Sequence, residues 1–84
     1  LVDLVEAALD GRLHEVEARW DPRAAVGVVL AAGGYPDDPA KGEAIEGLEA
    51  AARLPGKVFH AGTARAGGKV VTSGGRVLCA VGLG

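Results

Sequence analysis

The sequence lacks the features that define several common classes of protein. A single cysteine among 84 residues cannot form an internal disulfide, which predicts a reducing, cytoplasmic location. Nine Lys and Arg residues against eleven Asp and Glu residues give a net charge of -2. Without a surplus of positive charge the chain has little with which to neutralise a phosphate backbone, so we predict no nucleic-acid partner.

Long apolar runs are also missing. The longest covers residues 24–32, contains Gly27 and ends at Gly33, whereas a membrane helix needs about 20 apolar residues. Acidic residues interrupt the apolar N-terminus, a pattern that argues against a signal peptide. We therefore expect a soluble chain with no membrane partner. Methionine is absent and the sequence begins at Leu1, so we expect a fragment of a longer protein.

Hydrophobic patterning predicts one small α+β domain dominated by antiparallel strands. Apolar residues at helical spacing favour a helix over residues 1–10, which Gly11 ends. Alternation of apolar and polar residues predicts a half-buried strand over residues 13–20. Continuous apolar runs predict strands buried on both faces over residues 24–32 and 76–83. We expect these two long strands to pair near the centre of the sheet.

Shorter elements fill the middle of the sequence. Residues 43–48 suit a short strand, and residues 49–54 are helix formers that cover fewer than two turns. A strand over residues 57–63, a turn at 66–68 and a return strand over 69–72 predict a hairpin. A chain of this size buries only about 60–65% of its surface, so the thin core favours docking on a larger body.

Two glycine-rich segments are candidate binding sites. The loop over residues 33–42 combines exposed glycine amides with Tyr35 and Lys41 directly after a buried strand. Such a loop can hold an anion, or it can be a long solvated connection. Arg76 follows two glycines and opens the last strand. Its guanidinium can bind a carboxylate or phosphate, or it can form a salt bridge at the strand end.

The remaining motifs define neither a catalytic nor a metal site. The segment GTARAGGK at residues 62–69 lacks the spacing and the following helix of a phosphate-binding loop, and it fits a hairpin turn. His14, His60 and Cys79 are not spaced to share a metal ion, so we predict no metal site and no catalytic residue. Cys79 fits core packing, and His60 fits a hydrogen-bonded, partly buried position better than a ligand.

Four segments together carry a resemblance to a known family. They are VVLAAGGYP at 28–36, Lys41-Gly42, VFHAGTA at 58–64 and VVTSGGRVLCAVGLG at 70–84. In their order and spacing they resemble the C-terminal domain of the glycinamide ribonucleotide synthetases, also called phosphoribosylamine-glycine ligases, which belong to the ATP-grasp enzymes. The chain departs from the family pattern at Asp37 and Pro39, where the family usually has glycine and tyrosine.

The resemblance implies an ATP-dependent ligase of purine biosynthesis that joins 5-phosphoribosylamine to glycine and releases ADP and phosphate. It implies that ATP and Mg²⁺ (or Mn²⁺) are bound by the upstream ATP-grasp domain, so this chain alone is not expected to be active. Residues 1–12 resemble the helix that leaves that domain. Residues 13–84 resemble a small barrel-like domain, similar to the "rudiment hybrid" motif of biotin carboxylases, that caps the active site. The implied partners are the other domains of the same enzyme and the two substrates.

The resemblance and the residues point to the same candidates for binding the phosphate or carboxylate of the substrates. These candidates are Gly33, Gly34, Tyr35, Pro36, Lys41, Gly42, Gly74, Gly75 and Arg76. We expect them to bind and position the substrates and not to transfer protons. The alternative is a noncatalytic barrel that serves a larger assembly as a docking or carrier module. A carrier needs an exposed lysine at a hairpin tip, where Lys69 lies, although Lys69 lacks the usual flanking residues.

Overall fold

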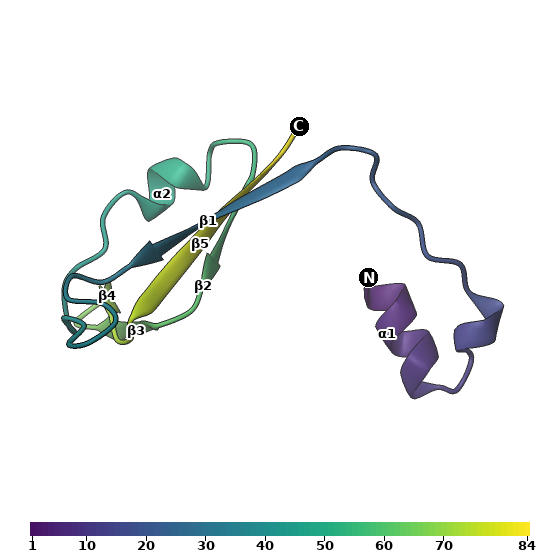
Figure 1. Ribbon diagram of the computed structural model, residues 1–84, viewed down its shortest axis with the longest axis horizontal. Coiled ribbons are helices and arrows are strands. Elements are labelled where there is room, and N and C mark those ends of the chain that lie inside the picture. The colour runs from purple at the N-terminus through teal and green to yellow at the C-terminus, as the bar shows by residue number, and fades with distance from the viewer.

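Two antiparallel sheets form the β-rich body of the chain (Figure 1). The computed structural model describes all 84 residues. In chain order the elements are α1 (Val2–Leu9), the 3₁₀ turn η1 (Leu13–Glu15), β1 (Ala25–Ala31), α2 (Leu48–Ala51), β2 (Lys57–His60), β3 (Thr63–Ala66), β4 (Lys69–Thr72) and β5 (Arg76–Leu83). The sheets have the strand orders β1-β5-β2 and β3-β4, and they do not close into a single barrel. The predicted α+β class with mostly antiparallel strands is confirmed.

The N-terminal helix α1 forms as predicted, but it stands apart from the sheets (Figure 1). Residues 16–24, which follow η1, contain no helix or strand and connect the two parts. The radius of gyration is 17.0 Å, whereas a compact chain of this length would have about 12 Å. The N-terminal segment and the sheets therefore do not share one core. No helix of the structure is long and apolar enough to span a membrane.

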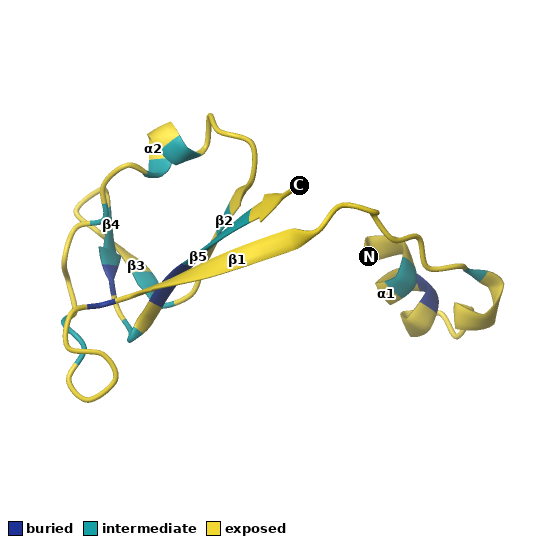
Figure 2. Ribbon diagram, turned by 45° about the horizontal axis from the view of Figure 1, so that its top comes forward, coloured by how far each residue is buried: buried dark blue, intermediate teal, exposed yellow.

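The central strand of the first sheet is β5, which pairs with β1 on one edge and with β2 on the other. The predicted pairing of the two long apolar strands is thus confirmed. Along its whole length, however, β1 is exposed (Figure 2). The prediction that both faces of this strand are buried is wrong, because β5 pairs with only one of its edges and no further layer of the chain covers it.

The predicted turn at 66–68 and return strand over 69–72 are confirmed as the tip and second strand of the β3-β4 hairpin, but the first strand is Thr63–Ala66, and residues 57–60 pair with β5 instead. The hairpin turn contains Gly67 and Gly68 at φ values of +56° and +78°, the left-handed conformations that two-residue hairpin turns require. The predicted strand over residues 57–63 ends at His60 as β2, because the chain bends after it and a separate strand, β3, begins at Thr63. At this bend the amides of Ala61 and Gly62 donate to the carbonyl groups at the start of β5.

The buried core is small and lies near the start of β5. Ala32, Val77 and Leu78 form it, and Ile45, Leu48 and Val58 pack against it. Ala32 directly precedes the glycine-rich loop, and Val77 directly follows Arg76. The buried core therefore adjoins both candidate binding segments.

Two predicted strands are wrong. Residues 13–20 form η1 and an exposed connection, because alternation alone supplies no partner strand for its hydrogen bonds. Residues 43–48 contain a single isolated bridge, Ala44 with Val71, and then enter α2. The short helix predicted after them is confirmed as α2, although it covers only Leu48–Ala51.

Candidate functional site

The loop after β1 and the turn before β5 meet in the structure. The amide of Ala32 donates to the carbonyl oxygen of Gly75 over 2.8 Å. The ring of Tyr35 lies directly on Gly75, since a Cβ added to Gly75 would be only 2.5 Å from Tyr35 Cδ2. Glycine at this position is thus what allows the aromatic ring to pack against the turn. Two candidate segments that are distant in sequence form one corner of the molecule.

The loop of residues 33–40 is closed by its own hydrogen bonds. The amide of Asp38 donates to the Gly34 carbonyl over 2.9 Å, and the amide of Ala40 donates to the Gly33 carbonyl over 2.8 Å. Gly34 has φ +84°, and a Cβ there would collide with the carbonyl oxygen of Asp38. Glycine is therefore required for the loop to close. The exposed Pro36 follows Tyr35 across a cis peptide bond.

Lys41 and Gly42 are held by Thr72, at the end of β4. The amide of Gly42 donates to the Thr72 carbonyl over 2.7 Å. The Thr72 hydroxyl donates to the carbonyl of Ala40 over 3.1 Å. The side chain of Lys41 is exposed between these two attachment points. Sequence reasoning missed Thr72, and its only signal was a polar residue at the end of an apolar strand.

The turn that precedes Arg76 is tightly packed backbone. The amide of Ser73 donates to the Gly62 carbonyl over 2.8 Å, and the amide of Gly62 donates to the Arg76 carbonyl over 2.9 Å. Arg76 lies opposite Ala31, where the register between β1 and β5 shifts at a bulge. Such bulges often redirect side chains near binding sites. Arg76 is exposed and forms no ion pair within the chain, so the salt-bridge alternative is not realised here.

This corner can bind an anion. Two exposed cations, Lys41 and Arg76, extend from backbone that hydrogen bonds fix on both sides. Cations on a fixed framework favour phosphate or carboxylate groups, because charge-assisted hydrogen bonds to them are strong. No group of three or more His, Cys, Asp or Glu side chains is placed to hold a metal ion.

Two other predicted residues lie outside this corner. His60 is hydrogen-bonded as predicted, with Nδ1 at 2.9 Å from Thr63 Oγ1, but it is exposed and not partly buried. At the strand end it has too few neighbours to cover it. Cys79 is a free, half-buried thiol on the sheet.

The two groups with shifted pKa values belong to the connection before β1. Arg23 donates to Asp21 through its backbone amide and its guanidinium, with the shortest side-chain contact at 2.6 Å. The side-chain hydrogen bond from Arg23, followed by the backbone one, lowers the pKa of Asp21 below its ordinary value. The same pairing raises the pKa of Arg23. This pair shapes the turn that leads into β1 and lies outside the candidate corner.

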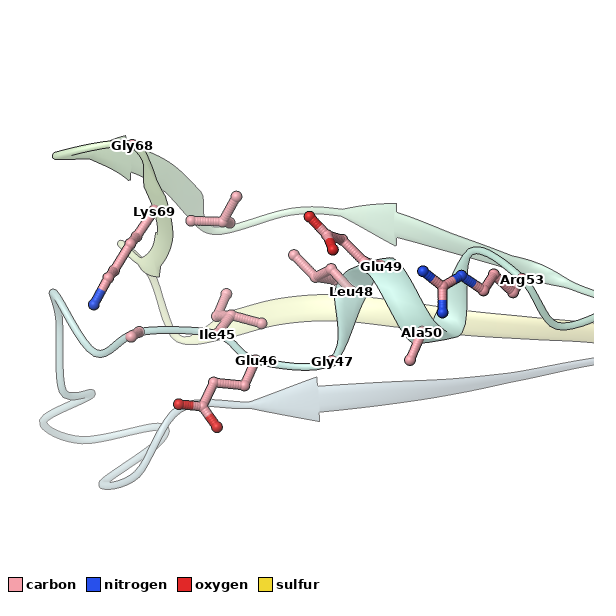
Figure 3. A pocket seen from close by; sticks show the side chains of 11 residues that line it. Ile45, Glu46, Gly47, Leu48, Glu49, Ala50, Arg53, Gly68 and Lys69 are labelled. Carbon is pink, nitrogen blue, oxygen red and sulfur yellow. The ribbon is translucent and has the colours of Figure 1, made fainter.

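A cavity of about 580 Å³ lies between the α2 segment and the tip of the β3-β4 hairpin (Figure 3). Ile45 and Leu48 extend toward the hairpin, and Lys69 lies across from them. None of the predicted site residues lines it. Its lining combines apolar side chains with both acidic and basic ones, so its chemistry favours no single class of ligand.

One face of the first sheet is apolar and uncovered. We call this the open sheet face; strand register places on it Val29, Phe59, Cys79, Val81 and Leu83, with Lys57 at its edge. Val29 is 55% exposed, Phe59 52% and Leu83 50%. The core residues Ile45 and Leu48 pack against β5 and β2 with Leu78 and Val58, which occupy the opposite face by the same register. An apolar face of this kind is typical of an interaction surface.

The structure is a small α+β domain in which the candidate corner carries two exposed cations and the first sheet has an uncovered apolar face. The chain belongs to the family described as phosphoribosylglycinamide synthetase, C domain, which matches residues 25–84. The expected family is thereby confirmed.

Relatives that match the whole chain bear the corresponding enzyme name. The chain is 73% identical over 84 residues to phosphoribosylamine-glycine ligase of Pseudomonas aeruginosa and 62% identical to that of Vibrio cholerae. It is also similar to the crystal structure of phosphoribosylamine-glycine ligase from Thermotoga maritima, with a TM-score of 0.68 and 46% identity over 96% of this chain. The chain spans 20% of the length of each of these proteins.

Proposed function

We propose that this chain is the C-terminal domain of a cytoplasmic ATP-dependent ligase. The ligase joins 5-phosphoribosylamine to glycine, giving glycinamide ribonucleotide, ADP and phosphate in purine biosynthesis. The observation that carries this proposal is the 73% identity, over the full chain, to a protein named phosphoribosylamine-glycine ligase. An overall identity of 73% across the full length of the chain supports a shared role for the domain.

Within that enzyme, the corner formed by the loop after β1 and the turn before β5 binds an anionic group of a substrate. The candidate groups are the phosphate of 5-phosphoribosylamine and the carboxylate of glycine. Lys41 and Arg76 supply charge, and the glycine-rich backbone lets a ligand approach closely. These residues bind and orient the substrate, and none of them transfers a proton.

ATP and Mg²⁺ (or Mn²⁺) belong to the upstream domain in this proposal. They supply activation of the glycine carboxylate for attack by the amine. The present chain contributes a wall of the active site, which it caps from one side. The candidate residues form an exposed corner on this chain, so the opposite wall comes from the other domains.

The open sheet face supports the proposed packing against those domains. Its apolar side chains, together with Trp20 at 86% exposure, would be covered in a larger body. Residues 1–12 then form the helix that leaves the ATP-grasp domain, and residues 13–84 lead into and form the C-terminal domain. The separation of α1 from the sheets supports a division of the chain into two parts, although η1 packs with α1 and the connection between the parts is residues 16–24 (Figure 1).

The test of the function is ADP release by the full-length protein supplied with ATP and Mg²⁺. Glycine and 5-phosphoribosylamine are added together, and then each is omitted in turn. We expect release that requires both substrates. A folded protein that releases no ADP with both present would contradict the ligase and leave a noncatalytic docking module.

The test of the site compares two exposed lysines. A charge-assisted hydrogen bond contributes about 1.5–3 kcal/mol, so Lys41→Ala should raise the KM of one anionic substrate at least tenfold. Lys69→Ala, at the hairpin tip, is the matched control and should change KM less than twofold. If Lys41→Ala leaves the KM as little changed as Lys69→Ala does, the result would favour a domain that docks on the rest of the enzyme without touching substrate. A mass increase at Lys69 from a linked cofactor would support the carrier alternative.

A further inference from the structure

Thr72 is the one polar residue that is buried in the chain, with 8% of its surface exposed. Four hydrogen bonds connect it to residues 40–43. Its hydroxyl donates to the Ala40 carbonyl over 3.1 Å and accepts from the Glu43 amide over 3.2 Å. Its backbone accepts from the Gly42 amide over 2.7 Å and donates to the Glu43 carbonyl over 2.8 Å.

These hydrogen bonds hold the backbone on both sides of Lys41. The hydroxyl of Thr72 reaches the residue before Lys41 and, in the other direction, Glu43. The Thr72 hydroxyl therefore holds the Ala40–Lys41 peptide, and the Thr72 backbone carbonyl holds the Lys41–Gly42 peptide. Without the hydroxyl, the Ala40 carbonyl next to Lys41 would lose its hydrogen bond to Thr72, and the Ala40 side would be held only through the amide that donates to Gly33.

The same residue also leads directly into the turn that carries Arg76. Ser73 donates to Gly62, and Gly62 donates to Arg76. Thr72 thus connects the chain segment that carries Lys41 to the turn that carries Arg76. Two cations grip one anion well only when their separation is fixed, because misplacement weakens charge-assisted hydrogen bonds.

We propose that the Thr72 hydroxyl is a positioning group that fixes Lys41 relative to Arg76 for binding of the anionic substrate. The inference rests on the proposed function. Thr72 is buried beneath the loop and acts through Lys41, so it is not a catalytic residue.

The test uses two variants of the full-length ligase. Thr72→Val keeps the shape of the side chain and removes both hydroxyl hydrogen bonds, whereas Thr72→Ser keeps the hydroxyl. Thr72→Val should raise, at least fivefold, the KM of the same substrate that Lys41→Ala affects, with the KM of ATP and kcat within twofold. Thr72→Ser should restore that KM to within twofold of the unsubstituted protein.

A double variant shows whether Thr72 acts through Lys41. In a Lys41→Ala background, Thr72→Val should raise that KM by less than twofold more. A further rise of fivefold or more would overturn the proposal, as would an unchanged KM in Thr72→Val alone. Thr72→Ala is the second variant in case Thr72→Val does not fold. Failure of both to fold would assign Thr72 to domain stability and also overturn the proposal.

These outcomes are distinct from failure of the proposed function. If the unsubstituted protein releases no ADP with both substrates, the ligase itself is wrong. If it is active and Lys41→Ala raises KM while Thr72→Val does not, only the positioning role is wrong.

Discussion

Replacing Gly62 by alanine adds a single methyl group, which should disrupt the close backbone packing of the candidate corner. The φ of Gly62 is not in the left-handed region, so only close approach requires glycine here. A Cβ would lie 2.8 Å from Gly74 Cα and 2.9 Å from the Arg76 carbonyl oxygen. Both contacts are with backbone, which cannot rotate away as a side chain does. Gly62→Ala must therefore separate the bend after β2 from the turn before β5.

The magnitude follows from the overpacking and from two hydrogen bonds. Overpacking costs about 1–3 kcal/mol. The bonds Gly62 to Arg76 and Ser73 to Gly62, at 2.9 and 2.8 Å, each contribute about 1 kcal/mol. The sum is about 3–5 kcal/mol, so even its lower end should speed amide exchange in the corner at least 100-fold.

The assay is hydrogen-deuterium exchange of the full-length protein, followed by mass spectrometry of peptides covering residues 61–64 and 72–76. Gly82→Ala is the matched control, because no atom lies within 4 Å of an added Cβ there. Its exchange in these peptides should stay within twofold. Exchange in Gly62→Ala within threefold of the unsubstituted protein would refute the close-packing argument.

Three further predictions concern the loop, the open sheet face and the connection before β1. Gly75→Ala should displace the Tyr35 ring from the turn, because an added Cβ would lie 2.5 Å from Cδ2; a crystal structure that keeps the ring in place would contradict this. Cys79 should react with a maleimide at least tenfold more slowly in the full-length protein than in the 84-residue chain, as mass spectrometry of its peptide would report, because the open sheet face is covered there; equal rates would argue against that packing. NMR titration should find the pKa of Asp21 below its ordinary value and returned to it by Arg23→Gln, since Arg23 stabilises the carboxylate. The turn is therefore intact above the ordinary pKa of Asp21 and lost as pH falls through the lowered one, and an unchanged titration in Arg23→Gln would show that Arg23 is not the cause.

Local signals in the sequence predicted the elements that local rules determine. The turn at Gly67 and Gly68 needs only two residues at positive φ, and both the turn and its return strand lie where they were predicted. The apolar run that became β5 is long enough and rich enough in β-branched residues to be central. The strand predicted over residues 13–20 failed because a strand needs a partner, and alternation says nothing about where a partner lies.

The prediction that β1 is buried on both faces is wrong for a related reason. Its valines and Leu30 are typical of a strand covered on both faces, yet all are exposed in this chain. The residues of a strand do not indicate which other part of the protein covers it. In the proposed ligase, the covering atoms belong to other domains.

The sequence predicted the residues of the candidate site, but it did not predict that the two segments contact each other. The sequence singled out the loop with Tyr35 and the turn with Arg76 separately, and only the structure brings the tyrosine ring onto Gly75. Thr72 escaped notice because its role depends on hydrogen bonds to Ala40 and Glu43, far away in sequence. No local pattern records such contacts.

The measurement that tests the binding corner most directly is the substrate dependence of the ligase reaction in Arg76→Ala, with Arg65→Ala as the matched control. Both arginines are exposed and begin or lie within a strand, but only Arg76 belongs to the corner. In the full-length ligase, Arg76→Ala should weaken apparent binding of either glycine or the phosphoribosylamine, seen as a KM raised at least tenfold, which corresponds to about 1.4 kcal/mol. Arg65→Ala should change the KM of neither substrate by more than twofold. If Arg76→Ala also leaves both KM values within twofold, the corner does not bind substrate.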